Sequence, residues 1–223
     1  MRVKLVLLAL RLLFGRSNPW REARRRRNMM LLDVGCSDGV GSPAAALARR
    51  FGHHIVGLDV FLPVLETAAQ NRVYDHVVAG DGCHLPFEDD RFDVVVSLEV
   101  LEHLPKEQGV WLLHELERVS CWLVMISCPV GTWEQDVREG NPYQLHQYVW
   151  GLEEIKAMQF NEVRGVGFRA FSGDTWTALV NSPLRPLLRL LGAIATVVSY
   201  RCPRLASNVF AWKEVRSGRP VQT

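Results

Sequence analysis

The sequence of 223 residues has few cysteines and no recurring pattern among them. There are five, an odd number, and no two stand in C-x-x-C spacing, which argues against a disulfide framework. A reducing compartment fits best, so we predict a cytoplasmic protein. Internal repeats, low-complexity tracts and a Pro/Ser-rich linker are also missing. One globular domain is therefore expected after the N-terminal arm described below.

Long apolar runs are missing as well. The uncharged run at residues 190–200 is too short to cross a bilayer, which takes about 20 apolar residues. It has two interpretations: a core helix, or a lid or membrane-facing surface over the active site. The overall content of 48% hydrophobic and 22% charged residues is ordinary for a globular protein.

The net charge is only +2, but it is distributed unevenly. Residues 1–27 hold nine Lys/Arg and one acidic residue, which leaves 17 basic and 23 acidic residues in the remainder. This arm places Val3, Val6, Leu10 and Leu13 at helical spacing, and an arginine interrupting its apolar part argues against a signal peptide. Three interpretations stay open: a helix covering one edge of the domain, an interfacial helix contacting anionic lipid, or nucleic-acid contact by its arginine run.

The most informative stretch is residues 30–41, where an apolar strand ends in Asp33 and is followed by Gly35, Gly39 and Gly41. The alanine-rich segment that follows is predicted to be a helix. A strand, a glycine loop and a helix N-terminus together are typical of a cofactor site, because the helix presents free N–H groups to a polar ligand. The spacing matches the dinucleotide fingerprint G-x-G-x-x-G poorly.

The segment from Asp33 to Gly39 resembles the first motif of class I S-adenosylmethionine-dependent methyltransferases, written D-x-G-x-G-x-G. Ser37 stands in the place of the middle glycine, which a serine tolerates in most turn conformations. The resemblance implies that the loop holds the methionine end of the cofactor. The residues that it assigns to this part are Asp33, Gly35, Cys36, Ser37 and Gly39.

Three further strand ends follow in the family's order. Asp59 ends a second apolar strand, where a carboxylate can accept hydrogen bonds from both ribose hydroxyls. The resemblance implies that Asp81 and Gly82 bind the adenine, and that Val60 and Leu98 contact the cofactor. Each acid alone is more simply a helix cap or a loop residue, but their joint order favours the family.

The elements alternate, which predicts an α/β fold with a parallel sheet and helices on both faces. We expect strands at residues 29–34, 54–59, 76–80, 93–98, 122–128, 161–171 and 207–214, and helices at residues 43–51, 62–72, 106–119 and 152–159. The resemblance implies a Rossmann-like, seven-stranded, mostly parallel sheet whose last strand is antiparallel. We therefore divide the chain into an arm, residues 1–28, and a methyltransferase domain, residues 29–223. Within that domain, residues 172–205 form an apolar insertion outside the family pattern.

Candidate acceptor-side residues follow the fourth strand. In a helix, Glu99 would lie one turn from both Glu102 and His103. The E-x-x-E-H pattern is similar to the Mg²⁺-binding motif of small-RNA 2′-O-methyltransferases and ubiquinone-pathway O-methyltransferases, with His146 as a further ligand. We favour His103 and Glu99 as catalytic residues without a metal. A structural role for this segment, and packing for His146, stay open.

Aromatic residues gather after the fifth strand, where acceptors bind in this fold. They have two interpretations of equal weight, a pocket wall or satellite core. The residues are Trp133, Tyr143, Tyr148 and Trp150.

The sequence thus predicts an S-adenosylmethionine-dependent methyltransferase acting on a small-molecule acceptor. An oxygen of a lipid-linked or glycan-type molecule is favoured, with peripheral contact of residues 1–27 at the inner face of the membrane. Nucleic acid is not the expected partner. The alternatives are a metal-assisted RNA 2′-O-methyltransferase and a non-catalytic cofactor-binding scaffold.

Overall fold

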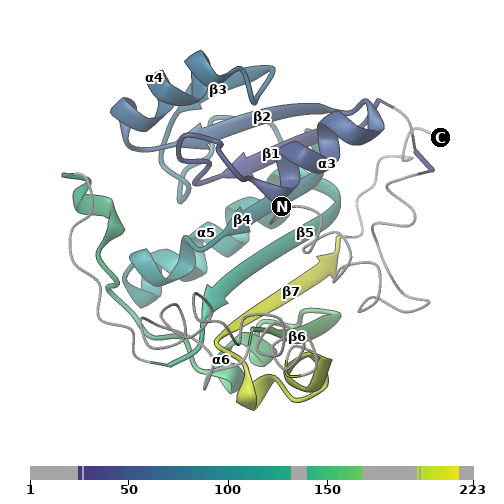
Figure 1. The fold of residues 1–223 in the computed structure, drawn as a ribbon, viewed down its shortest axis with the longest axis vertical. Helices are drawn as coiled ribbons and strands as arrows, with labels where there is room; N and C mark the ends of the chain where they lie inside the picture. The colour runs from purple at the N-terminus through teal and green to yellow at the C-terminus, as the bar shows by residue number, and fades with distance from the viewer. Residues whose placement is uncertain (1–24, 27, 132–139, 168–194, 196, 216–223) are drawn as a thin grey trace, which may run out of the picture.

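A computed structural model describes residues 25–26, 28–131, 140–167, 195 and 197–215. Seven strands form one sheet in the order β3-β2-β1-β4-β5-β7-β6 (Figure 1). They are β1 (Met30–Val34), β2 (His54–Asp59), β3 (His76–Ala79), β4 (Phe92–Leu98), β5 (Ser120–Pro129), β6 (Glu162–Val166) and β7 (Asn208–Glu214). The pairs from β3 to β5 are parallel, and β7 runs antiparallel to both β5 and β6. The predicted sheet with a reversed last strand is confirmed.

Four helices lie between the strands at the predicted places. They are α3 (Pro43–Phe51), α4 (Leu62–Asn71), α5 (Lys106–Val119) and α6 (Leu152–Ala157). Local sequence explains the ends of α3: the Ser42 hydroxyl accepts a hydrogen bond from the Ala45 N–H at 3.2 Å, and Gly52 ends the helix in the left-handed conformation. Short 3-10 helices are also present: η1 (Leu101–His103), η2 (Pro142–Gln144) and η4 (Pro203–Leu205).

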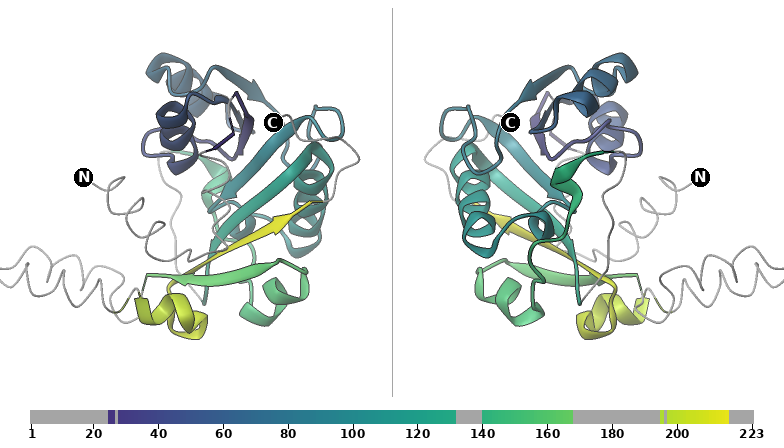
Figure 2. Two further views of the ribbon diagram at one scale, coloured as in Figure 1. Left: turned by 90° about the vertical axis from the view of Figure 1, so that its right-hand side faces the viewer. Right: turned by 90° about the vertical axis from the view of Figure 1, so that its left-hand side faces the viewer.

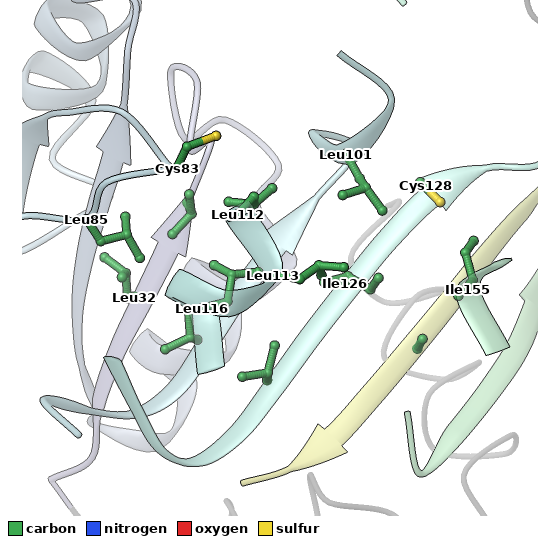
Figure 3. Packing of buried hydrophobic residues seen from close by; sticks show 14 of the residues in the cluster. Leu32, Cys83, Leu85, Leu101, Leu112, Leu113, Leu116, Ile126, Cys128 and Ile155 are labelled. Atoms are coloured by element: carbon green, nitrogen blue, oxygen red, sulfur yellow. The ribbon is translucent and has the colours of Figure 1, made fainter. Parts of the chain in front are cut away.

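The two faces of the sheet carry two separate cores, because alternate strand residues point to opposite sides. On one face, Leu32 and Ile126 pack against Leu112 and Leu116 of α5, as Figure 3 shows. On the other, Leu31 packs with residues of α3 and α4. Helices therefore cover both faces, as expected.

Different elements lie at the two edges of the sheet, beside β3 and beside β6. Figure 2 shows α4 and β3 at one end, and β6 with the yellow-green helical segment that precedes β7 at the other. That segment, residues 197–201, approaches β6 so closely that a Cβ on Gly165 would lie 2.2 Å from the Ser199 carbonyl oxygen. Val197 and Val198 are exposed while Tyr200 is buried, so this short part of the apolar insertion has both a packed and a solvent-facing side.

The remaining elements differ from the predictions at their bounds. β5 is longer than expected, and β6 ends at Val166, although a strand to residue 171 was expected. Residues 168–171, Trp133, residues 1–24 and most of the apolar insertion lie outside the described residues. Within the described part of the chain, no helix has the length and apolar character needed to span a membrane.

Candidate active site

The predicted site residues meet at one edge of the sheet. β1 lies between β2 and β4 and is parallel to both, so their carboxyl ends lie side by side. The glycine loop follows β1, Asp59 ends β2, and Leu98 ends β4, with Glu99 next in the chain. In open parallel sheets this edge is where ligands bind.

The glycine loop is folded back onto the end of β2 by three hydrogen bonds. The N–H groups of Gly35 and Cys36 both donate to the Leu58 carbonyl, at 2.7 and 3.0 Å. The Ser37 N–H donates to Asp59 Oδ2 at 2.9 Å. Ser37 has a φ of 49°, in the left-handed region that glycine prefers. This explains why the family motif has a glycine at this place.

Gly39 is required by a neighbour that the sequence analysis missed. A Cβ on Gly39 would lie 2.6 Å from the Tyr74 ring, and one on Gly57 would lie 2.9 Å from it. The Tyr74 hydroxyl donates to Asp33 Oδ2 at 2.9 Å. Tyr74 follows α4, far from the motif in sequence, so only the fold brings it to the loop.

Asp33 points into the protein rather than toward the open edge. It is 5% exposed, and its Oδ2 also accepts a 2.6 Å hydrogen bond from the hydroxyl of Ser42, the N-cap of α3. Burial raises the pKa of Asp33, against the opposing effect of the hydrogen bonds from Ser42 and Tyr74. The Asp33 carboxylate thus connects the glycine loop to the start of α3. Asp33 would influence a bound ligand by fixing the position of the loop, not by direct contact.

Asp59 offers acceptor capacity at the open edge. Its Oδ2 accepts from Ser37 and its Oδ1 accepts from the Phe61 N–H, both at 2.9 Å. These bonds fix the side chain and use two of the roughly four acceptor positions of a carboxylate. Two acceptor positions therefore remain for a ligand.

Asp81 follows β3 and is exposed. Its Oδ1 accepts from the Cys83 N–H at 2.8 Å, and its Oδ2 lies 3.2 Å from His84 Nδ1. Desolvation disfavours the charged form, but these bonds outweigh it, so the pKa of Asp81 is lowered. Next to it, a Cβ on Gly82 would lie 3.0 Å from Leu112, which leaves little space for a side chain.

The other predicted cofactor residues, Cys36, Val60 and Leu98, differ in how far their side chains are exposed to a ligand. The Cys36 thiol is buried against Gly57, so only the backbone of Cys36 faces the loop. Val60 is 42% exposed beside Asp59, which leaves an apolar side chain free for a ring to contact. Leu98 is half-buried at the end of β4.

The sequence analysis considered a helix that contains Glu99, but in the structure Glu99 lies outside any helix. Its φ is 57°, and its carboxylate accepts hydrogen bonds from the Ser127 hydroxyl at 2.6 Å and the Asn208 amide at 2.7 Å. Glu99 is exposed as a residue, but the protein around its carboxylate shields that group from water. This desolvation raises the pKa of Glu99 despite the two hydrogen bonds. Ser127 and Asn208 were missed by the sequence analysis because they lie on β5 and β7.

Glu102, His103 and His146 come together, with one potential ligand atom from each lying within 4.8 Å of the others. Glu102 is 3% exposed, and its burial, with the charge of Glu99 adding, raises its pKa to about 8. Burial lowers the pKa of His103, against the effect of the Leu145 and Gln144 carbonyls. Near neutral pH, His103 is therefore mainly neutral and able to accept a proton.

The aromatic residues divide between the two interpretations. Trp150 is core: it is 1% exposed and its indole N–H donates to the Leu101 carbonyl at 3.0 Å. Tyr148 packs edge-on against Trp150, and its hydroxyl donates to Glu154. Tyr143 is exposed and contacts Phe61, two residues after Asp59, so it borders the site.

A family model described as "Methyltransferase domain" matches residues 32–120, from β1 to the first residue of β5. Residues 32–120 are thus similar to the methyltransferase domain family. This confirms the class I resemblance that the glycine loop predicted.

Curated relatives match a stretch of this chain of similar length. Sterol 24-C-methyltransferase erg-4 of Neurospora crassa is 36% identical over 92 residues, which cover 39% of this chain and 24% of the relative. Methyltransferase GfsG of Streptomyces halstedii is 38% identical over 96 residues, 40% of this chain and 33% of the relative. The matches thus span about a quarter to a third of these relatives.

Solved structures extend the likeness of fold to nearly the whole chain. The [4+2]-cyclase SpnF aligns with a TM-score of 0.58 at 17% identity, over 94% of this chain and 81% of its own. Magnesium protoporphyrin IX methyltransferase of Synechocystis, solved with bound S-adenosylmethionine, aligns with a TM-score of 0.55 at 15% identity, over 97% and 80%. Because one neighbour is a cyclase, the fold alone leaves the reaction open.

The residues of the methyltransferase domain fit S-adenosylmethionine, the cofactor of this class. The Ser37–Asp59 hydrogen bond joins the glycine loop to the carboxylate that has two acceptor positions left. The chain has glycine at positions 35 and 82, where a Cβ would meet Val100 and Leu112 respectively.

Proposed function

We propose that this protein transfers the methyl group of S-adenosylmethionine to a small-molecule acceptor. The observation that carries the proposal is the Ser37–Asp59 unit, which aims a prearranged carboxylate at the sheet edge where the glycine loop ends. The cofactor supplies an electrophilic methyl group on a sulfonium. The protein's part is to bind, to orient and to exclude water.

We propose that different residues hold different parts of S-adenosylmethionine. The loop backbone from Gly35 to Gly39, including Cys36 and Ser37, would hold the methionine end, with Asp33 positioning that loop. Asp59 and Val60 would hold the ribose and one face of the adenine. Asp81, Gly82 and Leu98 would complete the adenine side.

On the acceptor side, we propose Glu99 and His103 as the reacting partners of an oxygen acceptor. Glu99 is exposed, and Ser127 and Asn208 fix its carboxylate, so it can orient a hydroxyl. His103, mainly neutral, has an electron pair with which to accept the hydroxyl proton. Glu99 would therefore orient the acceptor hydroxyl, and His103 would accept its proton.

We propose a lipid-linked or glycan-type acceptor. Exposed Leu62, Tyr143 and Leu145 lie on the segments that follow Asp59 and precede His146, at the border of the site. The relatives include sterol 24-C-methyltransferases, whose name gives an apolar acceptor, a sterol, that is methylated at carbon rather than oxygen. The acceptor atom therefore has to be measured.

The test is transfer of an isotope-labelled methyl group by the full chain to a panel of sterols, polyprenol-linked sugars, phenols and short RNAs. We expect label in an apolar small molecule and none in RNA, with the labelled atom identified by mass spectrometry. Labelled RNA would replace the proposal by the 2′-O-methyltransferase alternative. Binding of S-adenosylhomocysteine without transfer of label to any acceptor would favour the non-catalytic cofactor-binding scaffold.

A second proposal concerns residues 1–27, whose excess of basic residues suits anionic lipid. Full-length protein is expected to pellet with vesicles containing phosphatidylserine at low salt, and less so at high salt. A chain starting at Asn28 should stay in solution. If neither form pellets and the shorter chain melts several degrees lower, the arm covers the domain instead; the stacking of Arg26 on Trp122 at 4.0 Å is a contact of that kind.

A further inference from the structure

Two segments that are distant in the sequence bring one carboxylate and two imidazoles together. Glu102 and His103 lie in η1, after β4, while His146 lies just after η2, beyond β5. Their potential ligand atoms all lie within 4.8 Å of one another. The two imidazole rings meet edge to face with centroids 5.0 Å apart.

Backbone hydrogen bonds hold these segments side by side. The N–H groups of Gln147 and Tyr148 both donate to the Glu102 carbonyl, at 2.8 and 3.2 Å. The Gln147 side chain donates to the His103 carbonyl at 2.9 Å. The arrangement is therefore built by the protein itself, before any ligand binds.

The hydrogen bond of His103 fixes which of its nitrogens carries the electron pair. Nδ1 lies 3.3 Å from the Leu145 carbonyl, which accepts only from an N–H, so in the neutral ring Nε2 has the lone pair. That Nε2 lies 3.9 Å from Glu102 Oε1. A proton or a metal cation between these two atoms removes the repulsion of a lone pair that faces a carboxylate. Metal-bound histidines commonly donate their other N–H to a carbonyl, as His103 does here.

Glu102 gives the second, independent observation. The residue is 97% buried, since 3% of it is exposed, and its Oε2 is buried without a hydrogen-bond partner among the described residues. A buried carboxylate oxygen without a donor is costly, and a bound cation removes that cost.

We propose that Glu102, His103 and His146 bind one divalent transition-metal ion of the zinc type. Two imidazoles and a carboxylate suit Zn²⁺ better than Mg²⁺, which prefers oxygen ligands. Three protein ligands leave a position open, as in catalytic zinc sites.

The site differs from the Mg²⁺ set that the E-x-x-E-H pattern suggested. The Glu99 carboxylate is engaged by Ser127 and Asn208, so it is outside the proposed ligand set. The role of the ion rests on the proposed function: an acceptor hydroxyl at the open position would release its proton to solvent more readily. The ion would then take the place of His103 as the group that activates the hydroxyl.

The test is titration of metal-free, full-length protein with Zn²⁺ by calorimetry and with Co²⁺ by visible absorption. We expect one ion per chain. His146→Gln and the nearly isosteric Glu102→Gln should each weaken binding on the order of 100-fold and remove the Co²⁺ spectrum. The control is His114→Gln, because His114 is exposed on α5 and should bind like wild type.

Absence of binding at millimolar metal, or equal affinity in wild type and both ligand variants, overturns the proposal. Binding of S-adenosylhomocysteine is measured on the same samples. If it binds while Zn²⁺ does not, only the metal site fails. If Zn²⁺ binds to the three residues while S-adenosylhomocysteine does not, the metal site stands and the proposed function fails.

Discussion

Asp59→Ala is expected to weaken the binding of S-adenosylhomocysteine by about 30- to 150-fold, which corresponds to about 2–3 kcal/mol. The two acceptor positions that Asp59 has left suit the two ribose hydroxyls, and alanine offers neither. The substitution also frees the Ser37 N–H, which loosens the glycine loop. Titration calorimetry with the full chain measures the loss.

Glu66→Ala is the matched control, because Glu66 is an exposed carboxylate on α4, close to Asp59 in sequence. It should bind with wild-type affinity. Asp59→Asn keeps the size of the side chain and should lose less than alanine. An Asp59→Ala protein that melts normally and binds as wild type would remove Asp59 from the cofactor site.

The cofactor half of the site was predictable because its signal is local. The turn after β1 needs glycines, an acid ends β2, and each feature lies within a few residues of a strand that is apolar enough to recognise. Even the exception is local: Ser37 adopts the glycine-like φ of 49° where the motif has glycine. Strand order then brought these ends together.

The acceptor half was less predictable because tertiary contacts decide it. A helical spacing would have turned Glu99 toward Glu102, but a φ of 57° and donors from Ser127 and Asn208 hold Glu99 elsewhere. Asn208 lies 109 residues away, so no local pattern points to it. Tyr74 escaped notice for the same reason: its hydrogen bond to Asp33 spans 41 residues.

Trp150→Ala is expected to destabilise the protein by about 3–5 kcal/mol, the usual cost of truncating a buried tryptophan. The indole is 1% exposed and fits against Gly109, where a Cβ would lie 2.5 Å from its ring. Its N–H is also the donor to the Leu101 carbonyl. The loss should lower the melting temperature by roughly 6–20 °C in a chain of this size.

Leu101 begins η1, the turn that also carries Glu102 and His103, so the indole joins the core to the acceptor side. Trp150→Phe keeps most of the packing but loses the donor, and should cost less than alanine while still loosening η1. Tyr143→Ala removes an aromatic ring of the same loop that is 50% exposed, and should change stability by less than about 0.5 kcal/mol. If Trp150→Ala and Tyr143→Ala melt at the same temperature, Trp150 is not part of the core, and the anchoring of η1 must lie elsewhere.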